Sequence, residues 1–146
     1  MEIAFAKAGG LVPAIIQDHR TGDVLMLGFM NADALAETQH TEEVVFFSRS
    51  KNRLWKKGET SGHVLKLREI RVDCDADALL LRVEPVGAGV CHEGYRSCFF
   101  RRIEPDGSSS VIDDRVFAPE NVYGSTDKPR KLPDNAQSID PRGAKP

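Results

Sequence analysis

The sequence has no long hydrophobic run, little net charge and few cysteines, and each of these absences excludes some classes of function. The longest apolar run, VLMLGFM, falls well short of the roughly 20 residues that span a bilayer. A net charge of -2 gives no general attraction to nucleic acid or to a membrane surface. Three cysteines would leave one unpaired in a secreted protein, so we expect a cytoplasmic protein whose thiols are free or bind metal.

The composition predicts one globular domain followed by a tail. Hydrophobic residues make up 40% and charged residues 29% of the 146 residues, within the ordinary globular range. Six of the eight prolines fall between residues 104 and 146, where apolar residues are sparse. We therefore assign residues 1–103 to the domain and residues 104–146 to a Pro-rich tail that is partly docked or disordered. Within the tail, the stretch SVIDDRVFAPENVY could dock on the domain.

Apolar patterning in the domain predicts mainly β structure with one short helix. Residues 11–30 contain two apolar runs joined by a polar turn at residues 21–23, which predicts a hairpin. Asn31 then caps a helix rich in Ala, Leu and Glu. The alternation between residues 64 and 72 slips by one position near Glu69, which indicates a bulge. Further strands are expected at VVFFSRS, ALLLRVEPV and SCFFRRI.

Three cysteines could form a metal site. Cys91 and Cys98 lie seven positions apart, about 10 Å along a helix, whereas two thiolates on one zinc ion lie roughly 4 Å apart. The chain between them must therefore fold back, and Gly94 favours such a turn. Cys74 must come from elsewhere, in the same chain or in a partner subunit. Three ligands leave a position for water; His92 as a fourth ligand would close the site, and three buried cysteines acting as small hydrophobes are the other alternative.

Three carboxylates lie close to Cys74 in the sequence. Asp73, Asp75 and Asp77 are carboxylates of the kind that Mg²⁺ prefers, and Mg²⁺ is usually completed by waters and substrate phosphates. A fully extended strand would hold Asp73 and Asp77 about 13 Å apart, so either the segment curls or only two of the acids bind directly. The alternative is a turn that uses aspartate for local hydrogen bonding.

A basic stretch next to a glycine-containing loop could bind phosphate. Residues 49–68 hold seven basic residues against a single acid. The loop RLWKKGETSGH lacks the spacing of a Walker phosphate loop, but its cations and small donor residues suit a phosphate monoester. The alternatives are a solvated strand edge and, for the single Trp, core packing. The candidate substrate-binding residues are Arg49, Arg53, Trp55, Lys57, Glu59, Thr60, Ser61 and Gly62.

Five motifs in order resemble the phosphoribosyl-AMP cyclohydrolase family of histidine biosynthesis: PAIIQD, GDVLMLGFMN, SRSKNRLWKKGETSGH, RVDCDADALLLRVE and CHEGYRSCFFRR. The resemblance covers residues 11–102 and implies a mainly β (α+β), compact and barrel-like domain with one short capping helix, in an intertwined homodimer. It also implies zinc sites shared between subunits. The implied ligands are Cys74 of one chain with Cys91 and Cys98 of the other for zinc, and Asp73, Asp75 and Asp77 for magnesium.

The activity that the resemblance implies is hydrolytic opening of the adenine ring of phosphoribosyl-AMP at the N1–C6 bond. A ribosyl group on N1 makes C6 electron-poor, and zinc-activated water could attack that carbon. His92 is the first candidate for moving the proton and His63 the second, unless either is structural. Magnesium and the basic loop would hold the phosphate groups. Only 44 residues follow Arg102, so we expect no fused pyrophosphate-removing domain.

A zinc-stabilised nucleotide-binding or RNA-binding module is the alternative function. It would use Trp55 and the basic stretch without turnover, and it predicts a closed zinc site with four ligands. The enzyme interpretation instead predicts a stand-alone hydrolase that has phosphoribosyl-AMP as its small-molecule substrate, with neither nucleic acid nor membrane as a partner.

Overall fold

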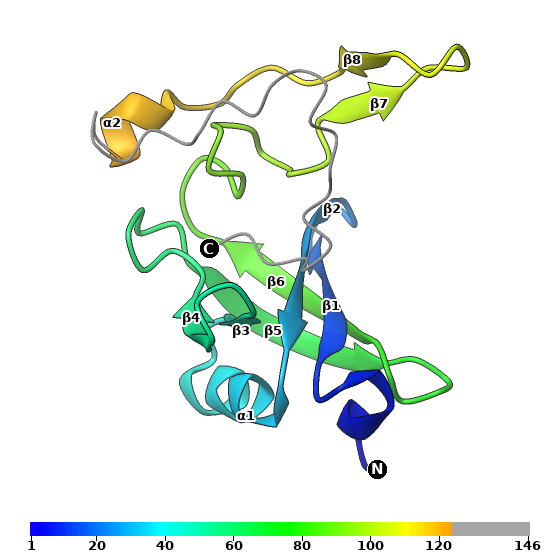
Figure 1. Cartoon of the computed structure of the whole chain (residues 1–146). Helices are drawn as coiled ribbons and strands as arrows, with labels where there is room; N and C mark the ends of the chain where they lie inside the picture. The colour runs from blue at the N-terminus through cyan, green and yellow to red at the C-terminus, as the bar shows by residue number, and fades with distance from the viewer. Residues whose placement is uncertain (124–146) are drawn as a thin grey trace.

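The computed structural model describes residues 1–123 and has an open four-stranded sheet at its centre (Figure 1). Its strands are β1 (Val12–Asp18), β2 (Val24–Met30), β5 (Leu65–Val72) and β6 (Leu79–Pro85), in the order β2-β1-β6-β5. β1 and β6 run parallel, and the other two pairs run antiparallel. Because β1 and β6 run parallel, their C-terminal ends lie next to each other, and the cysteine-containing loop of the candidate site follows at this end of the sheet.

The predicted mainly β fold with one short helix is confirmed, but the predicted barrel is not formed. β2 and β5 are the two edges of the sheet, and no ladder joins them within residues 1–123. Barrels whose interior is filled by side chains usually have about eight strands, and four strands are too few to close around a core. The edge strand β2 carries two exposed apolar side chains, Val24 and Leu27.

Local sequence signals are confirmed at three places. β1 and β2 form the expected hairpin, paired from Val12 with Met30 onward. The register of β5 against β6 shifts between Leu67 and Glu69, which is the predicted bulge. Asn31 caps the helix α1 (Ala32–Thr41), where its side chain accepts a hydrogen bond from a backbone N–H at 2.8 Å.

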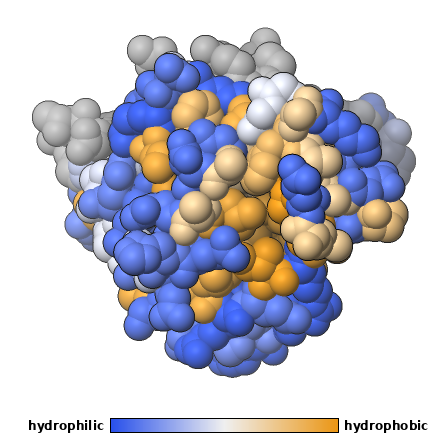
Figure 2. All heavy atoms as spheres, turned by 90° about the horizontal axis from the view of Figure 1, so that it is seen from below, coloured by the Kyte–Doolittle hydropathy of each residue, from blue (hydrophilic) through white to orange (hydrophobic). Residues whose placement is uncertain are grey.

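The core lies between the sheet and a layer made of α1 and the hairpin of β3 (Val45–Ser48) and β4 (Arg53–Lys56). Thr38 joins the two parts of that layer: its hydroxyl accepts from the Val45 N–H at 2.9 Å and donates to the Ala34 carbonyl at 2.8 Å. The largest fully buried side chains are Phe46, Ile16, Leu25, Met30, Leu65, Leu79 and Leu81. Viewed from the end that carries α1, hydrophobic residues occupy the middle of the face and hydrophilic residues surround them (Figure 2).

The remaining elements lie outside the sheet. The chain begins with the 3-10 helix η1 (Phe5–Ala8); β7 (Arg101–Ile103) and β8 (Ser109–Val111) form a hairpin apart from the sheet, and α2 (Pro119–Tyr123) follows (Figure 1). The predicted domain end at residue 103 falls within the β7–β8 hairpin, and residues 124–146 of the predicted tail lie outside the described part. None of the helices in that part has the length and apolarity for a membrane span.

Candidate functional site

The loop that follows β6, residues 89–98, is here called the cysteine loop. Neither of its two cysteines forms a disulfide; Cys91 is buried and Cys98 is partly buried. Between them the chain turns back: the Cys91 N–H donates to the Tyr95 carbonyl at 3.0 Å, and the Gly94 N–H donates to the Cys91 carbonyl at 3.0 Å. Gly94 has a φ of +96°, a conformation that glycine adopts without strain. The fold-back that the spacing predicted is therefore present.

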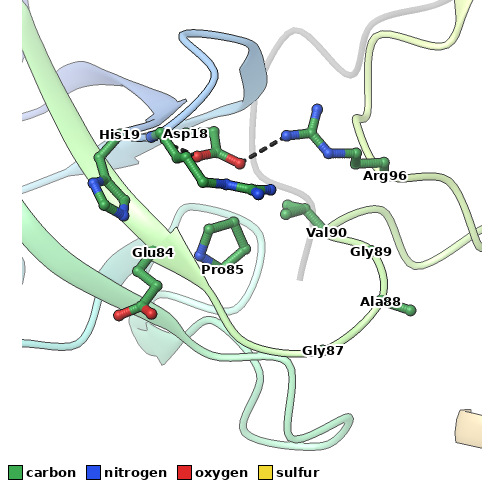
Figure 3. Close-up of a pocket in the computed structure, with 10 residues that line it drawn as sticks. Asp18, His19, Glu84, Pro85, Gly87, Ala88, Gly89, Val90 and Arg96 are labelled. Atoms are coloured by element: carbon green, nitrogen blue, oxygen red, sulfur yellow. Dashed lines mark hydrogen bonds and ion pairs between the residues drawn. The ribbon is translucent and has the colours of Figure 1, made fainter.

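The second half of the cysteine loop is fastened to the β1–β2 hairpin. The Cys98 N–H donates to the Leu25 carbonyl at 2.7 Å. Arg96 reaches further, because one guanidinium nitrogen lies 2.7 Å from the Asp18 carboxylate and another lies 2.5 Å from Asp23. Figure 3 shows Asp18 and Arg96 pointing toward each other at a cavity of about 470 Å³, which opens between the end of β1 and residues 87–90.

Asp18 keeps its negative charge although its residue is only 3% exposed. Burial acts to raise the pKa of this carboxyl, but the backbone N–H groups of Arg20 and Thr21, together with the Arg96 guanidinium, lower it below the ordinary value. The ionised Asp18 of β1 thus faces the guanidinium of Arg96, which belongs to the cysteine loop. This arrangement fixes the loop by charge as well as by backbone hydrogen bonds.

The turn between β5 and β6 holds Cys74 and the three candidate magnesium ligands. Asp73 builds the turn, since its carboxylate accepts hydrogen bonds from the Asp77 N–H at 3.0 Å and the Ala78 N–H at 3.2 Å. Desolvation acts to raise the pKa of Asp73, but these two N–H groups lower it overall. Asp77 pairs with Lys7 at 3.1 Å. The segment therefore curls, and Asp73 makes the local turn bonds that the alternative interpretation expected.

Cys74 lies apart from the other two cysteines within one chain. It is exposed, and its thiol donates to Asp75 at 3.6 Å. The turn and the cysteine loop lie at opposite ends of β6 (Figure 1), a strand of seven residues that spans about 20 Å at roughly 3.3 Å per residue. Among residues 1–123 of this single chain, no three His, Cys, Asp or Glu side chains gather to hold a metal ion. A site with all three cysteines would therefore need a second copy of the chain.

The loop between β4 and β5 carries most of the predicted substrate-binding residues. An ion pair of 3.3 Å between Arg53 and Glu59 ties β4 to this loop. The Ser61 hydroxyl accepts a hydrogen bond from the His63 backbone N–H at 3.1 Å. Four exposed or partly buried residues of the set lie in this loop: Glu59, Thr60, Ser61 and Gly62. A fifth, Arg53, is the first residue of β4 and is joined to the loop by its ion pair with Glu59. Except for the partly buried Ser61, they are exposed, so the loop can meet a ligand from solvent.

The other three predicted substrate-binding residues are more buried. Trp55 is 9% exposed and packs on Phe46 with ring centroids 5.6 Å apart, which agrees with the core-packing alternative. The Lys57 ammonium is buried 5.7 Å from the centroid of the Trp55 ring. The Arg49 guanidinium lies 4.4 Å from the centroid of the Phe29 ring. Substrate binding by these three side chains stays a prediction.

The two candidate proton carriers lie at the cysteine loop. His92 follows Cys91 directly and is partly buried. His63 lies near the end of the loop between β4 and β5, and its Nδ1 lies 3.0 Å from the Gly89 carbonyl of the cysteine loop. That hydrogen bond brings together two motifs that are 26 residues apart in the sequence.

Sequence reasoning missed Asp18, Arg96 and Tyr123. Asp18 could have been found, because every second residue of β1 is buried and Asp18 is the last of these positions. A buried acid needs a charged or hydrogen-bonding partner. Burial raises the pKa of the Tyr123 phenol, a hydrogen bond with Ser61 opposes the rise, and the nearby cysteines of the loop add to it. Tyr123 comes from α2, beyond all the motifs, and no pattern in the sequence pointed to this contact.

Comparisons with known proteins agree with the motifs. The phosphoribosyl-AMP cyclohydrolase family model matches residues 26–100. A phosphoribosyl-AMP cyclohydrolase of Nitratidesulfovibrio vulgaris is 56% identical over 119 residues, which cover 82% of this chain and 94% of the relative. Proteins of the same name from Solibacter usitatus and Desulforapulum autotrophicum are 53% and 51% identical, covering 85% and 84% of this chain and 98% of each relative.

Proposed function

The chain belongs to the phosphoribosyl-AMP cyclohydrolase family, and from this premise we propose that it opens the adenine ring of phosphoribosyl-AMP by hydrolysing the N1–C6 bond, a step of histidine biosynthesis. This makes it a hydrolase that acts on a cyclic amidine C–N bond. The observation that carries the proposal is identity above 50% over nearly the full length of relatives with this name.

Cys74, Cys91 and Cys98 are the residues that we propose to hold zinc. None of the three cysteines is in a disulfide, and thiolate sulfur is a ligand that zinc favours. Cys91 and Cys98 share one loop that folds back on itself, whereas Cys74 is exposed at the far end of β6. The donor set therefore fits zinc if two chains each contribute part of it. Bound there with one open position, zinc would act as a Lewis acid that lowers the pKa of a water molecule.

Exposed apolar side chains support the proposed homodimer. Val24 and Leu27 lie on the open edge strand β2, and Phe99, Ile103 and Val111 lie on or beside the β7–β8 hairpin, where Ile103 is 77% exposed. Unpaired strand edges and large exposed apolar side chains favour association. A partner chain that covered these positions could also bring its own Cys74 turn to the cysteine loop.

Histidine side chains at the cysteine loop would move protons. His92 is next to Cys91, and His63 reaches the loop through its Nδ1. Hydrolysis needs an acceptor for a proton of the attacking water and a donor for the N1 that leaves C6, and one imidazole can serve in both steps. Three cysteines without a disulfide also fit the reducing cytoplasm, where we place the reaction.

The loop between β4 and β5 and the turn that contains Cys74 would hold the phosphate groups of the substrate. Thr60, Ser61 and the backbone N–H groups of the loop are hydrogen-bond donors, and Arg53 adds a cation next to them. Magnesium on Asp73, Asp75 and Asp77 stays part of the proposal; Asp73 accepts its two backbone hydrogen bonds through the same carboxylate oxygen, Oδ1. Base stacking on Trp55, which the alternative binding module needs, is not favoured, because that side chain belongs to the core.

Ring opening of phosphoribosyl-AMP, followed by ultraviolet absorbance, tests the proposal. We expect turnover by the zinc-loaded protein, and no turnover from a pure, zinc-loaded dimer would overturn the enzyme assignment. Cys98→Ala should lose zinc and activity together, while the exposed control Ser109→Ala should keep both. Undiminished activity in Cys98→Ala after verified loss of zinc would refute the proposed role of the metal.

A further inference from the structure

The segment after the β7–β8 hairpin, residues 112–123, docks on the cysteine loop and is here called the C-terminal segment. The Val116 N–H donates to the Gly94 carbonyl at 2.8 Å, and the Phe117 N–H approaches the same carbonyl at 3.3 Å. The Arg115 guanidinium lies 5.6 Å from the centroid of the Tyr95 ring. A side chain at residue 94 would collide with the Phe117 carbonyl oxygen. The segment therefore fits the loop closely, although it lies outside the motifs and outside residues 26–100.

The C-terminal segment also reaches His63. The Phe117 ring meets the imidazole edge to face, with centroids 5.0 Å apart and an interplanar angle of 82°. Aromatic pairs favour this arrangement, and it restricts rotation of the smaller ring. Because His63 is partly buried, Phe117 forms one wall of the space that the imidazole occupies.

Two residues of the chain between β6 and Cys91 hold His63 on other sides. The Gly89 carbonyl lies 3.0 Å from Nδ1. A carbonyl oxygen only accepts hydrogen bonds, so Nδ1 must carry a proton, and in the neutral ring Nε2 then has the free lone pair. Gly87 lies against the same ring, where an added Cβ would be 2.8 Å from Nε2. The same Cβ would lie closer still to the ring carbon Cδ2, so the imidazole can take this position only because residue 87 has no side chain.

We propose that Phe117 is a positioning residue: together with Gly87 and the Gly89 carbonyl, it fixes His63 as the Nδ1–H tautomer and presents Nε2 as a proton acceptor at the cysteine loop. This inference rests on the proposed function. In the hydrolysis, the water oxygen bonds to C6 and a water proton passes to Nε2. When the N1–C6 bond breaks, Nε2 returns that proton to N1. The second water proton passes from the C6 hydroxyl to the exocyclic nitrogen of the neutral 6-imino substrate, so that C6 ends as a carboxamide, while the Nδ1 hydrogen bond persists throughout.

The test compares Phe117→Leu with Phe117→Tyr, which keeps the aromatic ring. Ile112→Leu, at the start of the same segment, is the control. Nitrogen-15 NMR of histidine-labelled protein reports the tautomer, and His63→Gln assigns the signals. We expect Nδ1–H in the unmodified protein, a mixture of tautomers in Phe117→Leu, and the original tautomer in the other two. Ring opening should show a kcat lowered roughly tenfold in Phe117→Leu, with KM changed less than about twofold and zinc content unchanged.

Three results would overturn the inference. They are an Nε2–H tautomer in the unmodified protein, an unchanged kcat in Phe117→Leu, or a loss of zinc that accounts for the lower rate. If Phe117→Leu does not fold, Phe117→Met, which also lacks the ring, takes its place with the same expected and contradicting results. Failure of the proposed function looks different, because the unmodified protein would then open no ring while its His63 tautomer remained measurable.

Discussion

Replacement of Asp18 by Asn should weaken the attachment of the cysteine loop to the sheet. Asn keeps an acceptor for the Arg20 N–H, which lies at 2.8 Å, but it loses the charge that faces Arg96. A hydrogen bond between two charged groups contributes about 1.5–3 kcal/mol, and the 37% exposure of the Arg96 side chain lowers the expected effect to about 2 kcal/mol. For a chain of this size that corresponds to a melting temperature lower by about 4–8 °C.

The pH dependence of this loss separates the charge from packing. The pKa of Asp18 is lowered in the folded protein from its ordinary value of 3.8, so the stabilisation is present above that value and disappears as the pH falls through the lowered pKa. Urea denaturation of zinc-free protein at one concentration should show the full difference at pH 7 and a smaller one near pH 3. Asp23→Asn, at a carboxylate 58% exposed to solvent, is the control and should cost less than about 1 kcal/mol. An equal loss for Asp18→Asn at both pH values would refute the electrostatic explanation.

Three further substitutions test packing, capping and docking. Gly28→Ala would place a Cβ 2.5 Å from the buried Phe46 ring, so we expect a loss of about 2 kcal/mol in urea denaturation; an unchanged midpoint would contradict the packing. Asn31→Ala should cost about 1 kcal/mol, whereas Asn31→Ser should cost much less, and equal losses would argue against the cap. Gly94→Ala should release the C-terminal segment from the cysteine loop, seen as faster hydrogen exchange at Phe117; unchanged protection would show that the contact tolerates a side chain.

Features set by a few neighbouring residues could be predicted from the sequence. The cap at Asn31 and the bulge near Glu69 depend on chemistry within one turn or one strand pair, and both are present. The fold-back between Cys91 and Cys98 could also be predicted, because the zinc hypothesis requires two neighbouring thiolates and Gly94 allows a turn between them.

Features that depend on distant parts of the chain were harder to predict. Closure of a barrel depends on pairing between the edge strands β2 and β5, and the apolar alternation within a strand does not specify its neighbours. The contact between His63 and Phe117 joins two segments 54 residues apart, and no spacing rule relates them. Arg96 lies inside a recognised motif, but its pairing with Asp18 depends on how the loop crosses the hairpin.

Mixed dimers give the most direct test of the proposed shared zinc site. Cys74→Ala and Cys98→Ala chains carrying different tags can be produced together, and dimers containing one of each isolated. Because each site would take Cys74 from one chain and Cys98 from the other, one of the two sites escapes both changes. The mixed dimer should therefore bind about half of the normal zinc and open phosphoribosyl-AMP at about half the normal rate, while each variant alone does neither. A mixed dimer as devoid of zinc and activity as its parents would contradict the shared site.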